Sequence, residues 1–69
     1  MNQVFRRTAE SDYTALLIAD AIESFPDCEI ITINRLESGY EIWARYDKDA
    51  GDLEVVDREI QEALGYFDV

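Results

Sequence analysis

The chain contains no histidine and a single cysteine, Cys28. Histidine is the commonest general acid–base residue of enzymes, so the usual proton-transfer group is missing. One thiol makes no disulfide within the chain, and without histidine it makes no zinc cage. We therefore expect a non-enzymatic protein without a metal or cofactor, in which Cys28 is a small, buried or half-buried side chain.

Long apolar runs are also missing. No run approaches the ~18 residues that cross a bilayer, and the opening stretch MNQVFRR lacks the apolar core of a secretion signal. The expected location is the reducing cytoplasm, which is the host cytoplasm if a phage encodes the protein. Sixty-nine residues make one domain. A domain of this size buries only about 60% of its unfolded surface, so good packing or self-association must stabilise it.

Basic residues are few: six Lys and Arg stand against sixteen Asp and Glu, for a net charge of −10. Such a charge repels nucleic acid and anionic membranes, so neither is an expected direct partner. The acids are unevenly spread. Residues 9–27 hold five acids and no base, and residues 47–69 hold eight acids and two bases. Residues 28–46, in contrast, have a net charge of only −1.

Two acidic segments show helical periodicity. The first helix is expected over Ala9–Phe25, capped by Thr8 or Ser11 and ended by Pro26, with Tyr13 extending its apolar stripe. That stripe consists of Leu17, Ile18, Ala21, Ile22 and Phe25. The second helix is expected over Asp52–Leu64, with Gly65 in the left-handed position after it. Its stripe consists of Leu53, Val56, Ile60 and Leu64.

The middle segment is predicted to be a β-hairpin with strands Glu29–Arg35 and Tyr40–Tyr46. The preferred register pairs Ile33 with Ile42, Ile31 with Ala44 and Arg35 with Tyr40 on the face toward the helices. Ile30 and Trp43 then lie on the opposite face. A slip of one residue would exchange the faces of one strand relative to the other.

The expected fold is therefore α+β, in the order α-β-β-α, with two helices packed on one face of an antiparallel hairpin. Two strands alone make a weak sheet. Gln3-Val4-Phe5 is a candidate for a short third strand, and a second subunit is the alternative way to complete the sheet.

The acidic helix faces are the first candidate site. Carboxylates three or four residues apart on a helix lie about 5–6 Å apart, a spacing comparable to that of successive phosphates on a DNA strand. Two rows would then fit a basic groove that normally binds nucleic acid. Tyr13, Tyr46 and Tyr66 would add stacking contacts at the rim. The alternative interpretation is that these acids only keep the protein soluble. The rows are Asp12, Asp20, Glu23 and Asp27 on the first helix, and Asp52, Glu59 and Glu62 on the second.

The second candidate is the sheet face around Trp43. An exposed tryptophan beside Arg45 is typical of interface centres, so this face is a candidate for dimerisation or for binding a toxin or regulator. The alternative is ordinary packing within the chain, against Val4 and Phe5. A third candidate, the stretch from Asp47 to Glu54, resembles the start of a calcium loop, but its glycine comes one residue early. We interpret this stretch as a charged loop before the second helix.

In its size, its acid-rich helices and the hairpin of Glu29–Arg35 and Tyr40–Tyr46, the chain resembles the small acidic proteins with which phages inhibit host enzymes. These include anti-CRISPR proteins and DNA-mimic inhibitors of restriction systems. The resemblance implies a non-enzymatic inhibitor of a basic nucleic-acid-binding protein or nucleoprotein complex. The alternative hypothesis is a small dimeric interaction module, such as an antitoxin, immunity or regulatory protein, that binds through the Trp43 face.

Overall fold

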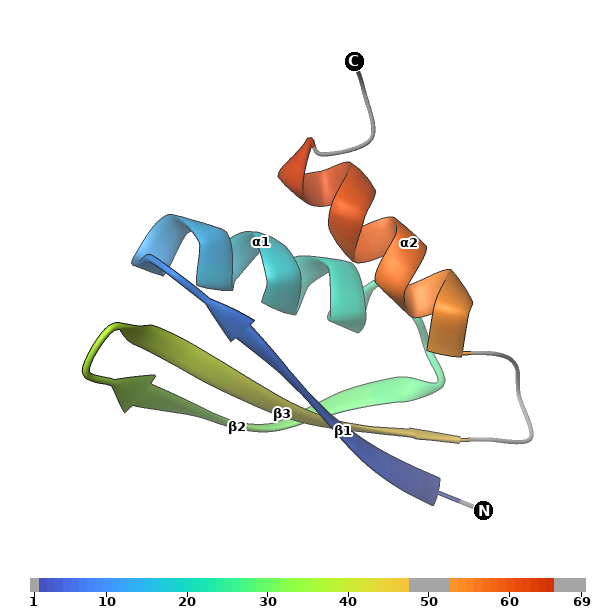
Figure 1. The fold of residues 1–69 in the computed structure, drawn as a ribbon. Helices are drawn as coiled ribbons and strands as arrows, with labels where there is room; N and C mark the ends of the chain where they lie inside the picture. The colour runs from blue at the N-terminus through green and yellow to red at the C-terminus, as the bar shows by residue number, and fades with distance from the viewer. Residues whose placement is uncertain (1, 48–52, 66–69) are drawn as a thin grey trace.

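The computed structural model describes residues 2–47 and 53–65, which form a sheet with both helices on one of its faces (Figure 1). The elements are β1 (Asn2–Ala9), α1 (Asp12–Glu23), β2 (Cys28–Leu36), β3 (Gly39–Asp47) and α2 (Leu53–Leu64). The α+β class is confirmed. The order α-β-β-α is wrong, because the candidate third strand is an eight-residue strand that precedes α1.

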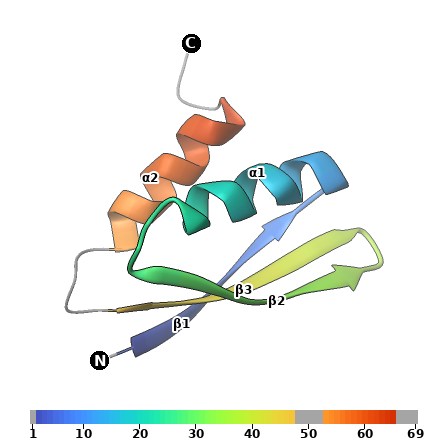
Figure 2. The ribbon, with the colours of Figure 1, turned by 180° about the vertical axis from the view of Figure 1, so that it is seen from behind.

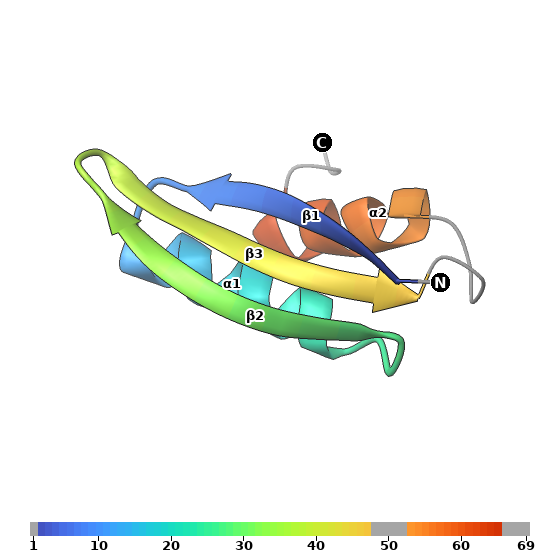
Figure 3. The same cartoon turned by 90° about the horizontal axis from the view of Figure 1, so that it is seen from below.

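The three strands form one antiparallel sheet in the order β1-β3-β2, so the last strand in sequence occupies the centre (Figure 3). β1 pairs with β3 along its whole length, from Asn2 opposite Asp47 to Ala9 opposite Tyr40. The polar run Arg6-Arg7-Thr8 hides this length in the sequence, because Arg7 occupies a position on the helix side where an apolar residue is expected. Arg7 instead pairs with Asp57 of α2.

The hairpin register is confirmed near the turn and wrong beyond it. Arg35 pairs with Tyr40 and Ile33 with Ile42, as predicted. An irregularity between Ile30 and Thr32 then places Ile30, rather than Ile31, opposite Ala44. An extra residue of this kind shifts the alternation of the bulged strand. As a result, Ile30 packs against the core, contrary to its predicted face, and Ile31 is 47% exposed.

The first helix is shorter than the sequence indicates. Ser11 caps α1 by accepting a hydrogen bond from the Thr14 N–H, and the helix ends at Glu23 rather than at Phe25. Tyr13 is 71% exposed and does not extend the apolar stripe. α2 begins at Leu53, and Gly65 after it has a φ of 79°, the expected left-handed conformation.

The core lies between the sheet and the helix layer (Figure 2). Ile22 and Ile42 are completely buried at its centre, one from α1 and one from β3. The second helix contributes Val56 and Ile60, as its stripe predicts, and Cys28 packs at the margin. Because the core lies between only two layers, the outer face of the sheet and the outer sides of both helices form the surface of the protein.

Candidate functional site

Charge in the described chain is segregated by layer. The strands and the hairpin turn (residues 2–9 and 28–47) carry four arginines and four acids, so the sheet layer is neutral. The segment 10–27 with α1 carries five acids and no base, and residues 53–65 with α2 carry four acids and Arg58. Both helices cover the same face of the sheet (Figure 1). The molecule therefore has an anionic side and an electrically neutral side.

The acids predicted on the first helix follow one exposed line. Asp12, Asp20 and Glu23 are all exposed on α1. Asp12 and Asp20 are about 12 Å apart along the helix axis, and Glu23 follows within one turn. Leu16 stands midway between the two aspartates and is 59% exposed, so this acid row contains an apolar centre.

The second helix repeats this arrangement. Glu59 and Glu62 are exposed, and they follow the 45% exposed Val55 at the same spacing by which Asp20 and Glu23 follow Leu16. Asp57 points elsewhere, because it is held by Arg7 of β1. Asp52, which the sequence places in this row, lies outside the described residues.

Asp27 does not join either row. It was predicted on the first helix, but α1 ends at Glu23 and Asp27 lies in the connection to β2. Its carbonyl accepts a hydrogen bond from the Asp47 N–H at 3.0 Å, which ties it to the end of β3. A hollow at this corner of the sheet is lined by Asp27 together with Glu29 and Arg45. The cause is Pro26, which separates Asp27 from the helix and would exclude it even if the helix reached its predicted end at Phe25.

Trp43 lies on the sheet face away from the helices, as predicted, and neighbours from its own chain partly cover it. The Arg6 guanidinium of β1 sits 5.8 Å from the centre of its ring. Cross-strand ion pairs flank it on both sides, one between Arg6 and Glu41 and one between Arg45 and Glu29. Hydrogen bonds from Trp43 and Asn34, together with Arg6, lower the pKa of Glu41. This face is therefore an ordered ladder of paired side chains around a half-buried tryptophan.

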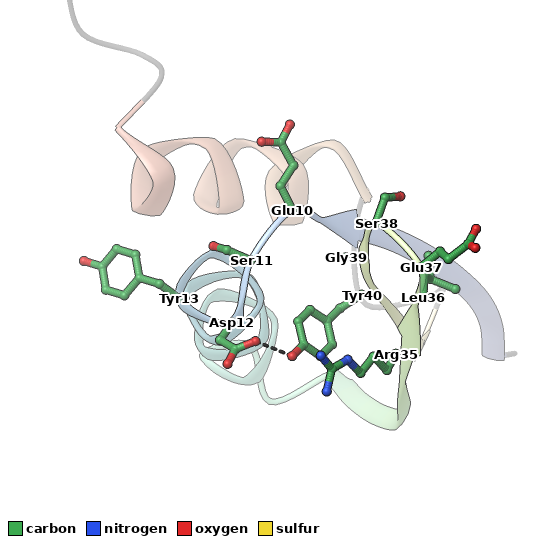
Figure 4. Close-up of a pocket in the computed structure, with 10 residues that line it drawn as sticks. All are labelled: Glu10, Ser11, Asp12, Tyr13, Arg35, Leu36, Glu37, Ser38, Gly39 and Tyr40. Atoms are coloured by element: carbon green, nitrogen blue, oxygen red, sulfur yellow. Dashed lines mark hydrogen bonds between the residues drawn. The ribbon is translucent and has the colours of Figure 1, made fainter.

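A shallow hollow of about 630 Å³ lies where the start of α1 meets the hairpin turn (Figure 4). Tyr40 donates a hydrogen bond to Asp12 across it, and this bond raises the pKa of Tyr40. Glu10, Glu37 and Tyr13 point outward around the rim, and Arg35 lies beside Tyr40 (Figure 4). Its surface is polar, with carboxylates and one guanidinium. Among the described residues, no group of three or more Asp, Glu, Cys or His is placed to hold a metal ion.

Sequence reasoning missed a smaller apolar hollow of about 220 Å³ between α1 and the edge strand β2. Leu16 and Ile33, which are 59% and 46% exposed, flank it. The signal was present in the sequence, since Leu16 is the one large apolar residue on the acid side of α1. Leu16 did not indicate a site from the sequence, because a single exposed leucine is common on protein surfaces and becomes informative only when a second apolar side chain lies beside it.

Two further sequence predictions concern the calcium-like stretch and the tyrosines. The stretch from Asp47 to Glu54 falls mostly outside the described residues, as does Tyr66. Tyr46 makes an edge-to-face contact with Phe5 at 5.6 Å and donates a hydrogen bond to Gln3, so its ring packs within the chain. Of the three tyrosines named for the rim, Tyr13 is the one that the structure shows as an exposed ring beside the acid row of α1.

Comparisons with protein-family models, curated proteins and solved structures find no match to this chain. Within residues 2–47 and 53–65, neither helix has the length and apolar character needed to cross a bilayer.

Proposed function

We propose that the protein is a non-enzymatic inhibitor that binds a basic nucleic-acid-binding protein through its acidic helix layer. The observation that carries the proposal is the segregation of charge: the excess of acids over bases in the described chain belongs to the helix side, and the sheet layer is neutral. A protein that needs acids only for solubility gains nothing from confining them to one side. A one-sided field, in contrast, orients the molecule toward a basic groove and accelerates its association.

The spacing of the acids supports the same partner. Asp12, Asp20 and Glu23 on α1, and Glu59 and Glu62 on α2, are exposed, and no base lies between them on α1. A groove that neutralises phosphates with Lys and Arg would accept such rows in place of nucleic acid. This is the behaviour of the phage-encoded DNA-mimic and anti-CRISPR inhibitors that the sequence resembles, and a phage–host setting is part of the proposal.

The test compares two variants with the same change in net charge. In the first, Asp20→Lys and Glu23→Lys reverse two acids of the α1 row. In the second, Glu29→Lys and Glu37→Lys reverse two acids of the sheet layer. Proteins captured from a bacterial lysate by the wild type are identified, and displacement of labelled DNA from the purified target is measured by fluorescence anisotropy.

We expect the α1 variant to lose displacement by at least tenfold and the sheet variant to retain it. We also expect the wild type to weaken steeply when salt rises from about 0.05 M to about 0.5 M, because salt screens exposed charges. Equal losses in both variants, or binding that is independent of salt, would show that the acid rows do not recognise the partner.

The second candidate function is a dimeric interaction module that uses the Trp43 face. The observation in its favour is that no described helix covers this side of the sheet (Figure 3). Light scattering of the wild type and of Trp43→Ala tests it. A dimer that becomes a monomer in the variant supports this function, and a monomeric wild type rules out the homodimer.

A further inference from the structure

The apolar hollow between α1 and β2 is a binding surface of a different kind from the acid rows. Its walls are Ala15, Leu16 and Ala19 from α1, Ile33 from β2, Tyr40 from β3, and Asp12 at one end. At about 220 Å³ it is smaller than the ~300 Å³ at which pockets for small molecules begin. A single large side chain of another protein, however, fits a hollow of this size.

The adjacent strand offers backbone hydrogen bonds. Among the described strands β2 pairs only with β3, so the outward N–H and C=O groups along its other edge have no strand partner. Beyond the irregularity at Ile31, the stretch from Thr32 to Leu36 pairs regularly with β3. This strand contains neither proline nor lysine, the residues that commonly block edge pairing. Ile31, Ile33 and Leu36 are each at least 40% exposed along it.

The helix side of the hollow's border is anionic, whereas Arg35 lies beside Tyr40 on the strand side (Figure 4), and the acids of α1 favour one of the possible occupants. Asp12 lines the hollow, and Asp20 lies one turn beyond Leu16 on the same side of α1. A second copy of the chain that paired β2 with β2 would bring two such acid rows toward one seam, where like charges repel. A basic segment would be attracted to the same border.

We propose that an extended segment of a basic partner docks here, pairing with β2 along Thr32–Leu36 and inserting one apolar side chain between Leu16 and Ile33. Strand addition of this kind obtains affinity from backbone hydrogen bonds and specificity from the side-chain pocket. The inference rests on the proposed function in taking the partner to be basic, and it assigns the α1–β2 side as the contact.

The experiment uses a synthetic peptide, Lys-Val-Lys-Leu-Lys-Val-Lys, titrated into the isotope-labelled protein and followed by NMR. A second peptide has alanine in place of its leucine. We expect the amides of Thr32–Leu36 and the methyl groups of Leu16 to shift, and the alanine peptide to bind at least tenfold more weakly. Leu16→Ser and Ile33→Ser should each weaken the leucine peptide at least tenfold. Val55→Ser, which changes the equivalent exposed residue of α2, should leave its affinity unchanged.

Several results would overturn the inference: no binding at millimolar peptide, shifts centred on β1 or Trp43, or full affinity in the Leu16→Ser variant. Concentration-dependent shifts of the β2 amides without peptide, together with a dimer in light scattering, would assign the edge to a second copy. The proposed function fails separately. If both peptides bind equally and Asp20→Lys with Glu23→Lys abolishes binding, the electrostatic proposal stands and the docking inference falls. If the peptide docks on β2 with equal affinity in the wild type and in the Asp20→Lys, Glu23→Lys variant, the docking inference stands and the electrostatic proposal falls.

Discussion

Gly39 lies where the hairpin turn meets the end of β1. Its φ is 152°, and a Cβ at this position would lie 2.1 Å from the Ala9 carbonyl oxygen. That oxygen belongs to backbone, which cannot move aside as a flexible side chain does. The glycine therefore allows the first strand and the turn to approach each other, beyond any role in the turn itself.

We expect Gly39→Ala to lower the free energy of unfolding by about 2 kcal/mol or more, since a disfavoured φ alone costs of order 1–3 kcal/mol. Gly65→Ala is the matched control, because Gly65 has a φ of 79° but, apart from its chain neighbours and its own helix backbone, no atom of the described residues lies within 4 Å of the place that a methyl group would occupy. Its loss should be about 1 kcal/mol. Urea unfolding of the two variants measures the difference, and equal losses would show that the contact with Ala9 carries no weight.

The hydrogen bond from Tyr40 to Asp12 can be tested through the pKa of the Tyr40 hydroxyl. The hydrogen bond to Asp12, desolvation and the Asp12 charge raise the pKa of Tyr40, and Arg35 opposes them. Because the folded-state pKa is raised, this bond contributes stability below the ordinary tyrosine pKa, and the contribution is lost as pH rises through the raised value. We expect Asp12→Ala to lower the pKa of Tyr40 toward its ordinary value in an NMR titration of the ring. The control Glu10→Gln should leave it unchanged, and an unchanged Tyr40 in the Asp12 variant would contradict the assignment.

At the scale of elements, Arg7 joins the first strand to the last helix. Its Nε and Nη2 atoms donate to the two Asp57 carboxylate oxygens, each at 2.7 Å, and its guanidinium lies 5.1 Å from the centre of the Phe5 ring. A two-point ion pair of this kind fixes orientation as well as distance. Since α2 packs mainly against α1, the pair is a direct tie between this helix and the sheet.

A double-mutant cycle with Arg7→Met and Asp57→Asn should give a coupling of about 1 kcal/mol, the upper end of the range for surface pairs. The comparison pair is Arg45 and Glu29, which is more exposed on the open sheet face. Its cycle, with Arg45→Met and Glu29→Gln, should give a coupling near zero. Thermal unfolding of all the variants provides both values, and a larger coupling in the exposed pair would overturn the expectation.

The elements that the sequence predicts well are those whose pattern is local. The Arg35–Tyr40 and Ile33–Ile42 pairs follow from the turn, and the stripe of Val56 and Ile60 follows from helical periodicity. The extra residue at Ile31 does not, because four apolar or β-branched residues in a row, Ile30 to Ile33, fit either register. The length of β1 was hidden because Arg7 satisfies an inward position by pairing across the molecule, which no local pattern records.

In the candidate site too, features that follow from local patterns were predicted, and features that depend on contacts between elements were not. Exposure of Asp20, Glu23, Glu59 and Glu62 follows from their place off the apolar stripes. The hollow beside Leu16 arises from the packing of α1 against the edge of β2, the next element along the chain, and the periodicity within each element does not record how the two meet. Asp27 lies outside its predicted row because it follows Pro26, beyond both the predicted helix end at Phe25 and the observed end at Glu23.

For the whole molecule, a helix layer with many more acids than bases has an energetic consequence. Mutual repulsion among like charges opposes the compact state. Ion pairs such as Arg6–Glu41 and Arg45–Glu29 offset little of it, because they lie in the sheet layer and surface pairs are weak. The proposed binding role of the helix layer and the stability of the fold therefore make opposite demands on its charge.

We therefore expect the melting temperature to rise by several degrees as NaCl is raised from about 20 mM to about 0.5 M, because the screening length falls below the spacing of the acids. Asp20→Lys with Glu23→Lys should melt higher than the wild type at low salt and should respond less to added salt. Differential scanning calorimetry measures both. A melting temperature that falls with salt would show that attractive pairs outweigh repulsion.

The central position of β3 also governs the order of events during synthesis. β1 leaves the ribosome first, yet its only described strand partner is made after α1 and β2. The sheet therefore cannot form completely until β3 has been synthesised. The pairing of β1 with β3 then brings together two strands that are separated by α1 and β2 in the sequence. Long-range pairing of this kind slows folding. Until that pairing forms, β1 lacks its native strand partner, and charged side chains such as Arg6 and Arg7 disfavour pairing of an open strand with other chains.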